Sequence, residues 1–185
     1  MLKEGVIMIN ISKIYTERKS NGTELENKVY DTLEKLNIKY ERIDNDEVNT
    51  MEECIAINDT LNTEIRKSIL LCNSKKTTFF LVVLPANKSL DTNLLAKKIG
   101  INKLSFASDD KMFELLGTTP GSLSIMGIIK DIDDYVQVIL DKEIINSEYF
   151  GCNDTKNTTH LKIKTNDLIN KFLPYTKHKP LIIDL

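Results

Sequence analysis

The spacing of apolar residues predicts helices and strands that do not alternate strictly along the chain. Apolar residues recur every three or four positions over 25–36, and Thr23 with Glu26 forms a capping box in front of them, so a helix is expected there. Thr50 with Glu53 forms a second capping box and predicts a short helix after it. Further helices are predicted over 92–99, 109–116 and 166–173.

Short apolar runs bounded by polar turns predict the strands. The runs 68–72 and 78–84 flank the polar turn 73–76, an arrangement typical of a β-hairpin. The other runs with strand character lie at 40–43, 104–107, 124–129, 135–140, 159–163 and 181–184. Because a hairpin and single helices occur together, the pattern favours an α/β (α+β) fold with a mixed sheet over a purely parallel, doubly wound one.

Length and composition indicate one globular domain. The chain has 185 residues, of which 41% are hydrophobic and 28% charged. A polar stretch at 17–22 divides an N-terminal extension, 1–22, from the main domain, 23–185. No apolar run reaches the roughly 20 residues that cross a bilayer, and the opening residues lack the long apolar core of a signal peptide. We therefore expect a cytoplasmic protein without a membrane partner.

The cysteines, histidines and net charge narrow the chemistry. Cys54, Cys72 and Cys152 are odd in number and far apart, which argues against a disulfide framework and a zinc site, so no metal or cofactor is expected. The two histidines, His160 and His178, are expected to be structural. A formal net charge of −2 gives no overall attraction for nucleic acid, and a DNA partner is not expected.

The most distinctive stretch is 117–127, which contains three glycines and one proline. Gly117 is placed to end the preceding helix with a positive φ, Pro120 fixes its own φ, and Gly121 lets the backbone approach a ligand closely. Such a loop can present backbone N–H groups to a ligand, or it can be an ordinary connection between a helix and a strand. Spacing alone does not choose between these alternatives.

Five segments of the chain form a specific combination: 65–73, 79–85, 104–107, the Thr-Pro-Gly-Ser loop at 119–122, and the Asn-Thr pair at 157–158. Together they resemble the prolyl-tRNA editing family, the YbaK/ProX-type deacylases, over about residues 25–185. Members of this family hydrolyse tRNA charged with the wrong amino acid, either as free-standing proteins or as an insertion domain of prolyl-tRNA synthetase. The resemblance implies a single domain with a curved, mixed, largely antiparallel sheet surrounded by helices.

The resemblance also implies the site. Lys67 would bind the terminal phosphate or the carbonyl end of the aminoacyl ester and stabilise charge as water attacks. Gly121, with the rest of the loop 117–121, would supply N–H groups to the ester carbonyl, so no side-chain nucleophile and no metal would be needed. The implied substrate-binding residues are Gly117, Thr119, Pro120, Ser122, Gly127, Asn153, Asn157 and Thr158.

The chain departs from the family pattern at three places. Asn153 and Asp154 stand where relatives have a histidine-proline pair, and Asn45 stands where a histidine often follows an aspartate. The loop continues through 124–127 as Ser-Ile-Met-Gly, where relatives commonly have Ser-Pro-Phe-Gly. Loss of two imidazoles could change the accepted amino acid, slow hydrolysis, or leave a binding protein without catalysis.

These observations predict a free-standing trans-editing hydrolase for mischarged tRNA(Pro). A synthetase pocket shaped for proline cannot strongly exclude smaller amino acids, since a missing methylene costs only about 1–3 kcal/mol. The resemblance implies alanyl-tRNA(Pro) as the first expected substrate and cysteinyl-tRNA(Pro) as the second. The expected partners are the tRNA acceptor end and prolyl-tRNA synthetase. Lysines that could form a local basic face for the tRNA are Lys75, Lys76, Lys97, Lys98, Lys103 and Lys111.

Two other hypotheses remain open. One is a non-catalytic protein on the same fold that binds an amino acid or charged tRNA. The other is an interaction module that has lost the site. The last predicts no pocket between Lys67 and the glycine loop, whereas the first two predict a concave one.

Overall fold

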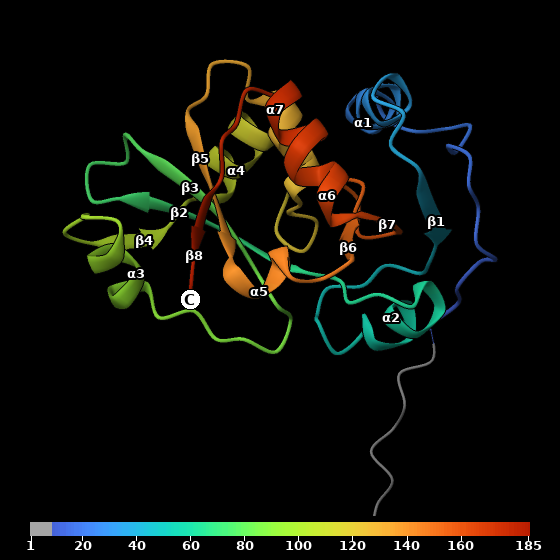
Figure 1. Cartoon of the computed structure of the whole chain (residues 1–185), viewed down its shortest axis with the longest axis horizontal. Coiled ribbons are helices and arrows are strands. Elements are labelled where there is room, and N and C mark those ends of the chain that lie inside the picture. Colours follow the sequence, from blue (N-terminus) through green and yellow to red (C-terminus); the bar gives the residue numbers. More distant parts are fainter. Residues whose placement is uncertain (1–8) are drawn as a thin grey trace, which may run out of the picture.

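The strands form two sheets in the computed structural model, which describes residues 9–185 (Figure 1). The larger sheet has the order β4-β2-β3-β5-β8, and the smaller has the order β1-β7-β6. The strands of the larger sheet are β2 (Lys67–Asn73), β3 (Phe79–Leu84), β4 (Leu104–Phe106), β5 (Val136–Asp141) and β8 (Leu181–Ile183). Those of the smaller sheet are β1 (Tyr40–Asp44), β6 (Tyr149–Asn153) and β7 (Thr159–Lys164).

Most neighbouring strands are antiparallel. The predicted hairpin joins β2 to β3, with Lys67 opposite Leu84 at its open end. β4 also pairs antiparallel with β2, whereas β3 with β5 and β5 with β8 are parallel. The smaller sheet is antiparallel throughout. The predicted mixed, largely antiparallel arrangement is confirmed, and the structure divides its strands between two sheets.

A close backbone contact joins the two sheets beside the start of β2. The N–H of Arg66 donates to the carbonyl of Gly151 on β6 over 2.9 Å, and Ile65 and Gly151 form an isolated parallel bridge. A Cβ at Gly151 would lie 2.6 Å from the carbonyl oxygen of Glu64, so only glycine permits this approach. The contact places Lys67, the next residue on β2, near the end of β6.

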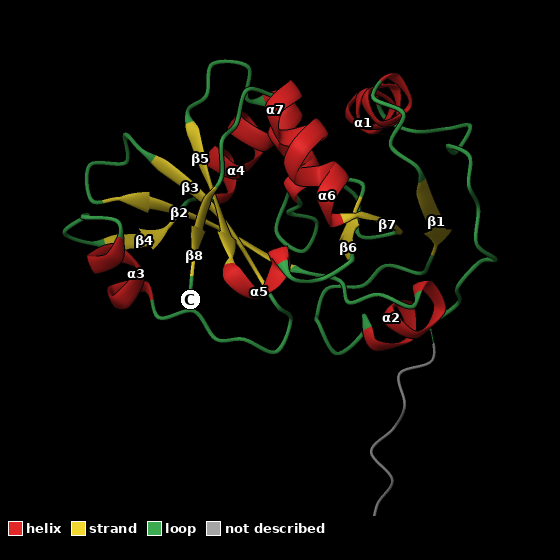
Figure 2. Cartoon of the chain, viewed as in Figure 1, coloured by secondary structure: helices red, strands yellow, loops and turns green. Residues whose placement is uncertain are grey.

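The helices cover the faces and edges of the sheets (Figure 2). Helix α1 begins after the Thr23 capping box as predicted, and α4 ends at Gly117, whose φ is +67°. At the C-terminus, α6, a π-helical turn at Leu168–Phe172 and α7 follow one another. The helix bounds are α1 (Glu24–Lys35), α2 (Ile55–Leu61), α3 (Thr92–Lys98), α4 (Asp109–Leu116), α5 (Lys142–Ile145), α6 (Thr165–Asp167) and α7 (Leu173–Tyr175).

Three hydrophobic clusters follow from this arrangement. The largest fills the space between the two sheets, α1 and the C-terminal helical segment, and includes Tyr30, Leu81 and Phe172. A second lies between the other face of the larger sheet and α3, as the alternation along β3 requires. The third packs α2 against β1. Within residues 9–185, no helix is both long and apolar enough to cross a membrane.

Three local predictions are wrong or incomplete. The run 124–129, predicted as a strand, forms a 3₁₀ helix, η1 (Ile125–Lys130). It is buried on all sides, and a short continuous apolar run has the same pattern in a buried strand and a buried helix. Strand β6 and helix α5 were not predicted. In β6, Gly151 and Asn153 interrupt the strand-forming residues.

The N-terminal segment lies along the free edge of β1. The described part of the predicted extension starts at Ile9, so residues 1–8 of it lie outside the described residues. Tyr15 pairs with Arg42, and Lys19 reaches a buried polar group. The Lys19 ammonium lies 3.0 Å from Asp154 Oδ2 and also pairs with Glu26. The Tyr30 hydroxyl donates to the same Asp154 oxygen over 2.7 Å.

Replacing Lys19 by methionine is expected to destabilise the protein by about 3–5 kcal/mol, because the buried Asp154 carboxylate loses its cation. The measurement is the free energy of unfolding in urea at neutral pH. Lys13→Met is the matched control, since Lys13 is exposed and forms no ion pair within residues 9–185. Equal stability of the two variants would contradict a structural role for the Lys19 contact.

Candidate functional site

A pocket of about 270 Å³ lies between the start of β2 and the glycine loop. Lys67 and Gly121, the two residues implied as catalytic, both line it, and so does Asn153. The turn before α2 forms one wall, and the ends of β6 and β7 form another. The full lining is Val48, Asn49, Thr50, Met51, Cys54, Ile65, Arg66, Lys67, Ser68, Gly121, Leu123, Asn153 and His160. The prediction of a pocket between Lys67 and the loop is confirmed.

Lys67 supplies a cation that no carboxylate neutralises within residues 9–185. It is half-buried, and its ammonium donates to the backbone carbonyl of Lys88. The neighbouring Arg66 guanidinium is held by Glu64 and by the Ser147 hydroxyl, 2.9 Å away. The Lys67 ammonium can therefore exchange a carbonyl contact for an oxygen of a bound ester or phosphate.

Two residues of the glycine loop, Gly121 and Leu123, line the same pocket. The Ser122 hydroxyl accepts from the N–H of Thr119 over 3.0 Å and the Ser122 N–H donates to the Thr119 carbonyl, which closes the loop on itself. Gly121 has a φ of +84°. Among the described residues, the N–H groups of Gly121 and Leu123 find no acceptor. Both residues line the pocket, so their unpaired N–H groups are candidate donors to a carbonyl oxygen.

The remaining implied residues lie at different distances from the pocket. Asn157 lies just outside, with its side-chain amide 3.1 Å from Asn49 Oδ1, and Asn49 in turn faces Gly121. Thr158 is exposed and does not line the pocket.

The remaining implied residues of the glycine loop do not line the Lys67 pocket. Thr119 and Pro120 are exposed, Ser122 shapes the loop, and Gly117 lines a neighbouring hollow beside α1. Gly127 is buried. A Cβ at this position would lie 2.7 Å from the carbonyl oxygen of Leu116, so the close packing there requires glycine.

His160 is a pocket residue that the sequence did not indicate as functional. It is 2% exposed, and its Nδ1 lies 2.8 Å from Asn45 Oδ1. The Asn45 amide nitrogen donates to the carbonyls of Asp46 and Asn157, over 2.7 and 3.0 Å, so Oδ1 must face the imidazole. Nδ1 therefore carries the hydrogen, and Nε2 is the unprotonated nitrogen. Burial lowers the pKa of His160 to about 4.

The missing signal for His160 was the register of β6. Residue 153 lies directly opposite residue 160 in the β6–β7 pair. Because β6 was not predicted, the sequence offered no reason to place the histidine beside Asn153.

Cys54 also lines the pocket, and its thiolate would be the strongest nucleophile there. Burial raises the pKa of the Cys54 thiol to about 11, so the thiol is protonated at neutral pH. A covalent mechanism through Cys54 is therefore not favoured, in agreement with attack by water.

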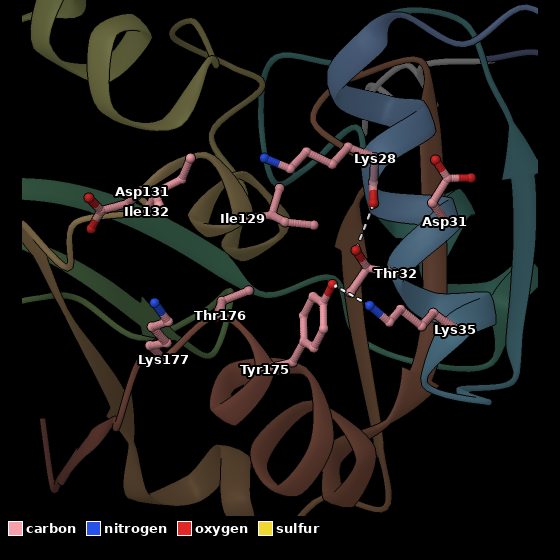
Figure 3. A pocket seen from close by; sticks show the side chains of 10 residues that line it. All are labelled: Lys28, Asp31, Thr32, Lys35, Ile129, Asp131, Ile132, Tyr175, Thr176 and Lys177. Atoms are coloured by element: carbon pink, nitrogen blue, oxygen red, sulfur yellow. Dashed lines mark hydrogen bonds between the residues drawn. The ribbon is translucent and has the colours of Figure 1, made fainter.

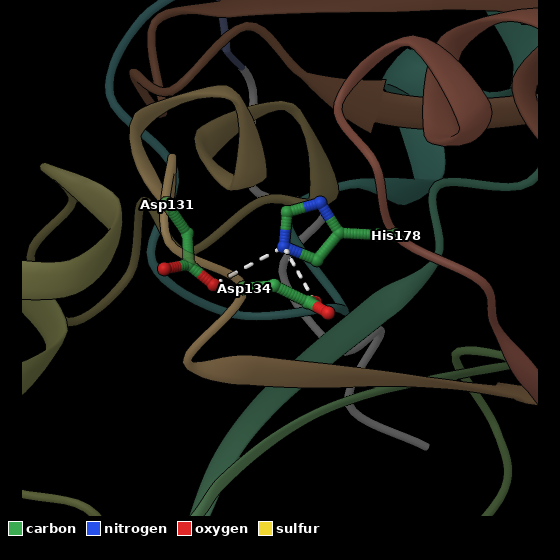
Figure 4. Close-up of side chains that lie close together, drawn as sticks. All are labelled: Asp131, Asp134 and His178. Carbon is green, nitrogen blue, oxygen red and sulfur yellow. Dashed lines mark hydrogen bonds and ion pairs between the residues drawn. The ribbon is translucent and has the colours of Figure 1, made fainter.

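One group of side chains elsewhere has the composition of a metal site (Figure 4). His178 Nε2 lies 3.1 Å from Asp131 Oδ2 and 3.5 Å from Asp134 Oδ1. Asp131 also accepts from the N–H groups of Tyr135 and Val136, over 3.1 and 2.7 Å. Burial raises the pKa of Asp131, but these hydrogen bonds and His178 outweigh it and hold the pKa below its usual value. The group is a hydrogen-bonded turn, and it shares no residue with the Lys67 pocket.

A second hollow, of about 350 Å³, lies between α1, η1 and α7 (Figure 3). Its side chains are tied to one another: the Lys35 ammonium lies 3.2 Å from the Tyr175 hydroxyl, and the Thr32 hydroxyl donates to the Lys28 carbonyl. None of the residues implied as functional lines it. The Lys67 pocket is therefore the stronger candidate.

The lysines expected to form a basic face are partly brought together. Lys75 and Lys103 line one hollow with Gly100, close to the end of α3 that carries Lys97 and Lys98. This hollow lies at the far end of β2, roughly 20 Å from Lys67 at about 3.3 Å per residue. Lys111 is instead paired with Glu114.

Comparison with known proteins identifies the family. Residues 45–171 match the model of the aminoacyl-tRNA editing domain. The chain belongs to this family. It is 32% identical over 136 residues to the prolyl-tRNA editing protein ProX of Acetoanaerobium sticklandii, a match that covers 74% of this chain and 83% of ProX. The editing domain and this likeness identify an aminoacyl-tRNA deacylase of the prolyl-tRNA editing type.

Two further relatives extend the match. The chain is 26% identical over 162 residues to the prolyl-tRNA synthetase associated domain-containing protein 1 of Danio rerio, covering 86% of this chain and 87% of that one. A crystal structure described as a candidate trans-editing enzyme for prolyl-tRNA synthetase superposes with a TM-score of 0.63 at 16% identity, covering 88% of this chain and 98% of that one. This structural likeness confirms the fold of the editing family.

Nitrogen-15 NMR of the imidazoles is expected to show His160 as the Nδ1–H tautomer, titrating near pH 4. The usual pKa of histidine is about 6.5. Stability contributed by neutral His160 is therefore complete above pH 6.5 and is lost as the pH falls toward 4. His160→Asn assigns the signal by removing it. A resonance with Nε2–H would contradict the contact of Nδ1 with Asn45. A midpoint near 6.5 would contradict the burial of the imidazole.

Proposed function

We propose that this protein is a free-standing trans-editing deacylase that removes alanine from mischarged tRNA(Pro), with cysteinyl-tRNA(Pro) as the second substrate. The observation that carries the proposal is that Lys67, which no carboxylate neutralises among residues 9–185, and Gly121 of the glycine loop line one small pocket. The likeness to ProX over 74% of the chain supports prolyl-tRNA as the nucleic acid.

The proposed reaction uses water as the nucleophile. The N–H groups of Gly121 and Leu123 donate to the ester carbonyl oxygen, and Lys67 stabilises the negative charge that develops on it. Water adds to the carbonyl carbon, the bond to the ribose oxygen breaks, and a proton passes to that oxygen. The products are a free amino acid and an uncharged tRNA. The aminoacyl ester is already activated, so positioning and charge stabilisation are the main tasks of the protein.

The pocket suits a small amino acid because part of its lining is apolar. Its volume of about 270 Å³ must hold both the amino acid and part of the terminal ribose. Val48, Met51 and Leu123 contribute apolar walls, and an apolar pocket that fits alanine excludes a proline ring by overlap. Editing thus removes an error that a proline-shaped synthetase pocket cannot reject by affinity alone.

The proposed partners are the acceptor end of the tRNA and prolyl-tRNA synthetase, in the cytoplasm. The hollow formed by Lys75 and Lys103 offers cations to phosphates away from the scissile ester. The distance between this hollow and Lys67 is longer than one nucleotide. The hollow would therefore contact the acceptor stem while the terminal adenosine enters the Lys67 pocket.

The first prediction concerns the substrate. Alanyl-tRNA(Pro) is expected to be hydrolysed fastest, cysteinyl-tRNA(Pro) more slowly, and prolyl-tRNA(Pro) not measurably. The measurement is release of labelled amino acid from each tRNA under identical conditions. Release from none of the three, by a protein shown to be folded, would instead favour the non-catalytic binding protein that the changes at Asn45 and Asn153 leave open.

The second prediction concerns Lys67. Lys67→Ala is expected to lower kcat on the order of 100-fold or more, because the developing oxyanion loses its cation. The melting temperature should change little, since the side chain makes one hydrogen bond to a backbone carbonyl. Lys39→Ala, at an exposed lysine outside every described pocket, serves as the control. Full activity of Lys67→Ala would remove the lysine from the mechanism.

A further inference from the structure

His160 is the one neutral nitrogen base in the wall of the Lys67 pocket. Its Nδ1 is occupied by Asn45, whose own amide group is fixed by two backbone carbonyls. Nε2 makes no hydrogen bond within residues 9–185 and is not sealed from the pocket. The imidazole is therefore held in one tautomer, with an unprotonated Nε2 on a residue that lines the pocket.

The surroundings keep this nitrogen unprotonated. The charged groups that line the pocket are Arg66 and Lys67, both cationic, and no carboxylate lines it among the described residues. Cys54, on the α2 side, is a protonated thiol at neutral pH. The cross-strand neighbours of His160 are Ile43 on β1 and Asn153 on β6, and both are uncharged. Strong burial opposes an imidazolium, and no lining carboxylate offsets it.

A buried histidine could be explained by packing alone, but the geometry here is more specific. A structural histidine uses both ring nitrogens in hydrogen bonds, as His178 does with Thr176 and Asp131. His160 uses one and leaves the other at the site where the reaction is proposed to occur. Nε2 can accept a hydrogen bond from a water molecule. The Lys67 ammonium and the loop N–H groups cannot, because they only donate hydrogen bonds.

We propose that His160 Nε2 accepts the hydrogen bond of the attacking water and takes its proton during hydrolysis. This inference rests on the proposed deacylase function. The water oxygen forms a bond to the ester carbonyl carbon, and the water proton moves to Nε2. When the bond between that carbon and the ribose oxygen breaks, Nε2 returns the proton to the ribose oxygen, so the imidazole ends neutral. The negative charge on the intermediate, beside Nε2, raises the basicity of the imidazole when the proton is needed.

The test uses His160→Asn in the full-length protein. The amide of asparagine can still donate to Asn45 Oδ1 but places no acceptor at the position of Nε2. We expect kcat for alanyl-tRNA(Pro) to fall on the order of 100-fold or more while KM stays within about twofold. In the unchanged protein the rate should fall on the acid side as Nε2 is protonated, and this acid limb should be absent from the variant.

Two further variants keep the result interpretable. His178→Asn removes the other imidazole of the chain, which lies in the Asp131 turn, and should retain kcat if assayed below its melting temperature. His160→Gln can place an amide oxygen near the position of Nε2, which can hold water but cannot take its proton, so its kcat should also be low.

The outcomes separate this inference from the proposed function. If the unchanged protein hydrolyses alanyl-tRNA(Pro) and His160→Asn is equally fast, only the role of His160 is overturned. A rise in KM with unchanged kcat would assign Nε2 to binding of the substrate amino group, which also overturns the proposal. If the unchanged protein releases no amino acid from any charged tRNA, both the proposed function and this role fail.

Discussion

The buried Asp154 carboxylate is the constraint on which the site depends. It has no exposed surface, and burial raises its pKa to about 6 even though Lys19 and Tyr30 both favour the charged form. Without those partners the carboxylate would be an uncompensated charge in the core. Asn153 precedes it and forms the pocket edge, so contacts that stabilise Asp154 also hold the chain that shapes the pocket. Lys19, far from the pocket in sequence, thereby contributes to its form.

The pocket is assembled by contacts between separate elements. Gly151 allows the chain before β2 to touch β6, and this contact brings Lys67 to the same space as His160 and Gly121. The cations, the loop N–H groups and the neutral imidazole come from different segments. Ser147 holds Arg66 and Asn45 holds His160, and both partners are distant in the sequence. The resulting electrostatics suit an uncharged ester carbonyl that becomes negative during reaction, next to the phosphate of a terminal nucleotide.

Local signals explain which parts of this arrangement were predictable. The capping box at Thr23, the hairpin around 73–76 and the positive φ of Gly117 are set by neighbouring residues, and the structure contains all three. The 3₁₀ helix η1 and strand β6 depend on burial and on a contact with a distant chain segment, for which the sequence carries no local signal. The resemblance placed Lys67 and Gly121, which share a pocket. It could not place His160, because its neighbours depend on strand register.

The long reach of Lys19 has a consequence for biosynthesis. Its ammonium also donates to Thr159, 140 residues further along the chain. During translation the N-terminal segment leaves the ribosome before β6 and β7. Until those strands emerge, Lys19 cannot contact Asp154 or Thr159. The parallel pairing of β5 with β8 likewise requires residues 181–183 to have been synthesised. The Lys67 pocket can thus form only after residue 160 has left the ribosome, because Lys67, Gly121 and His160 all line it.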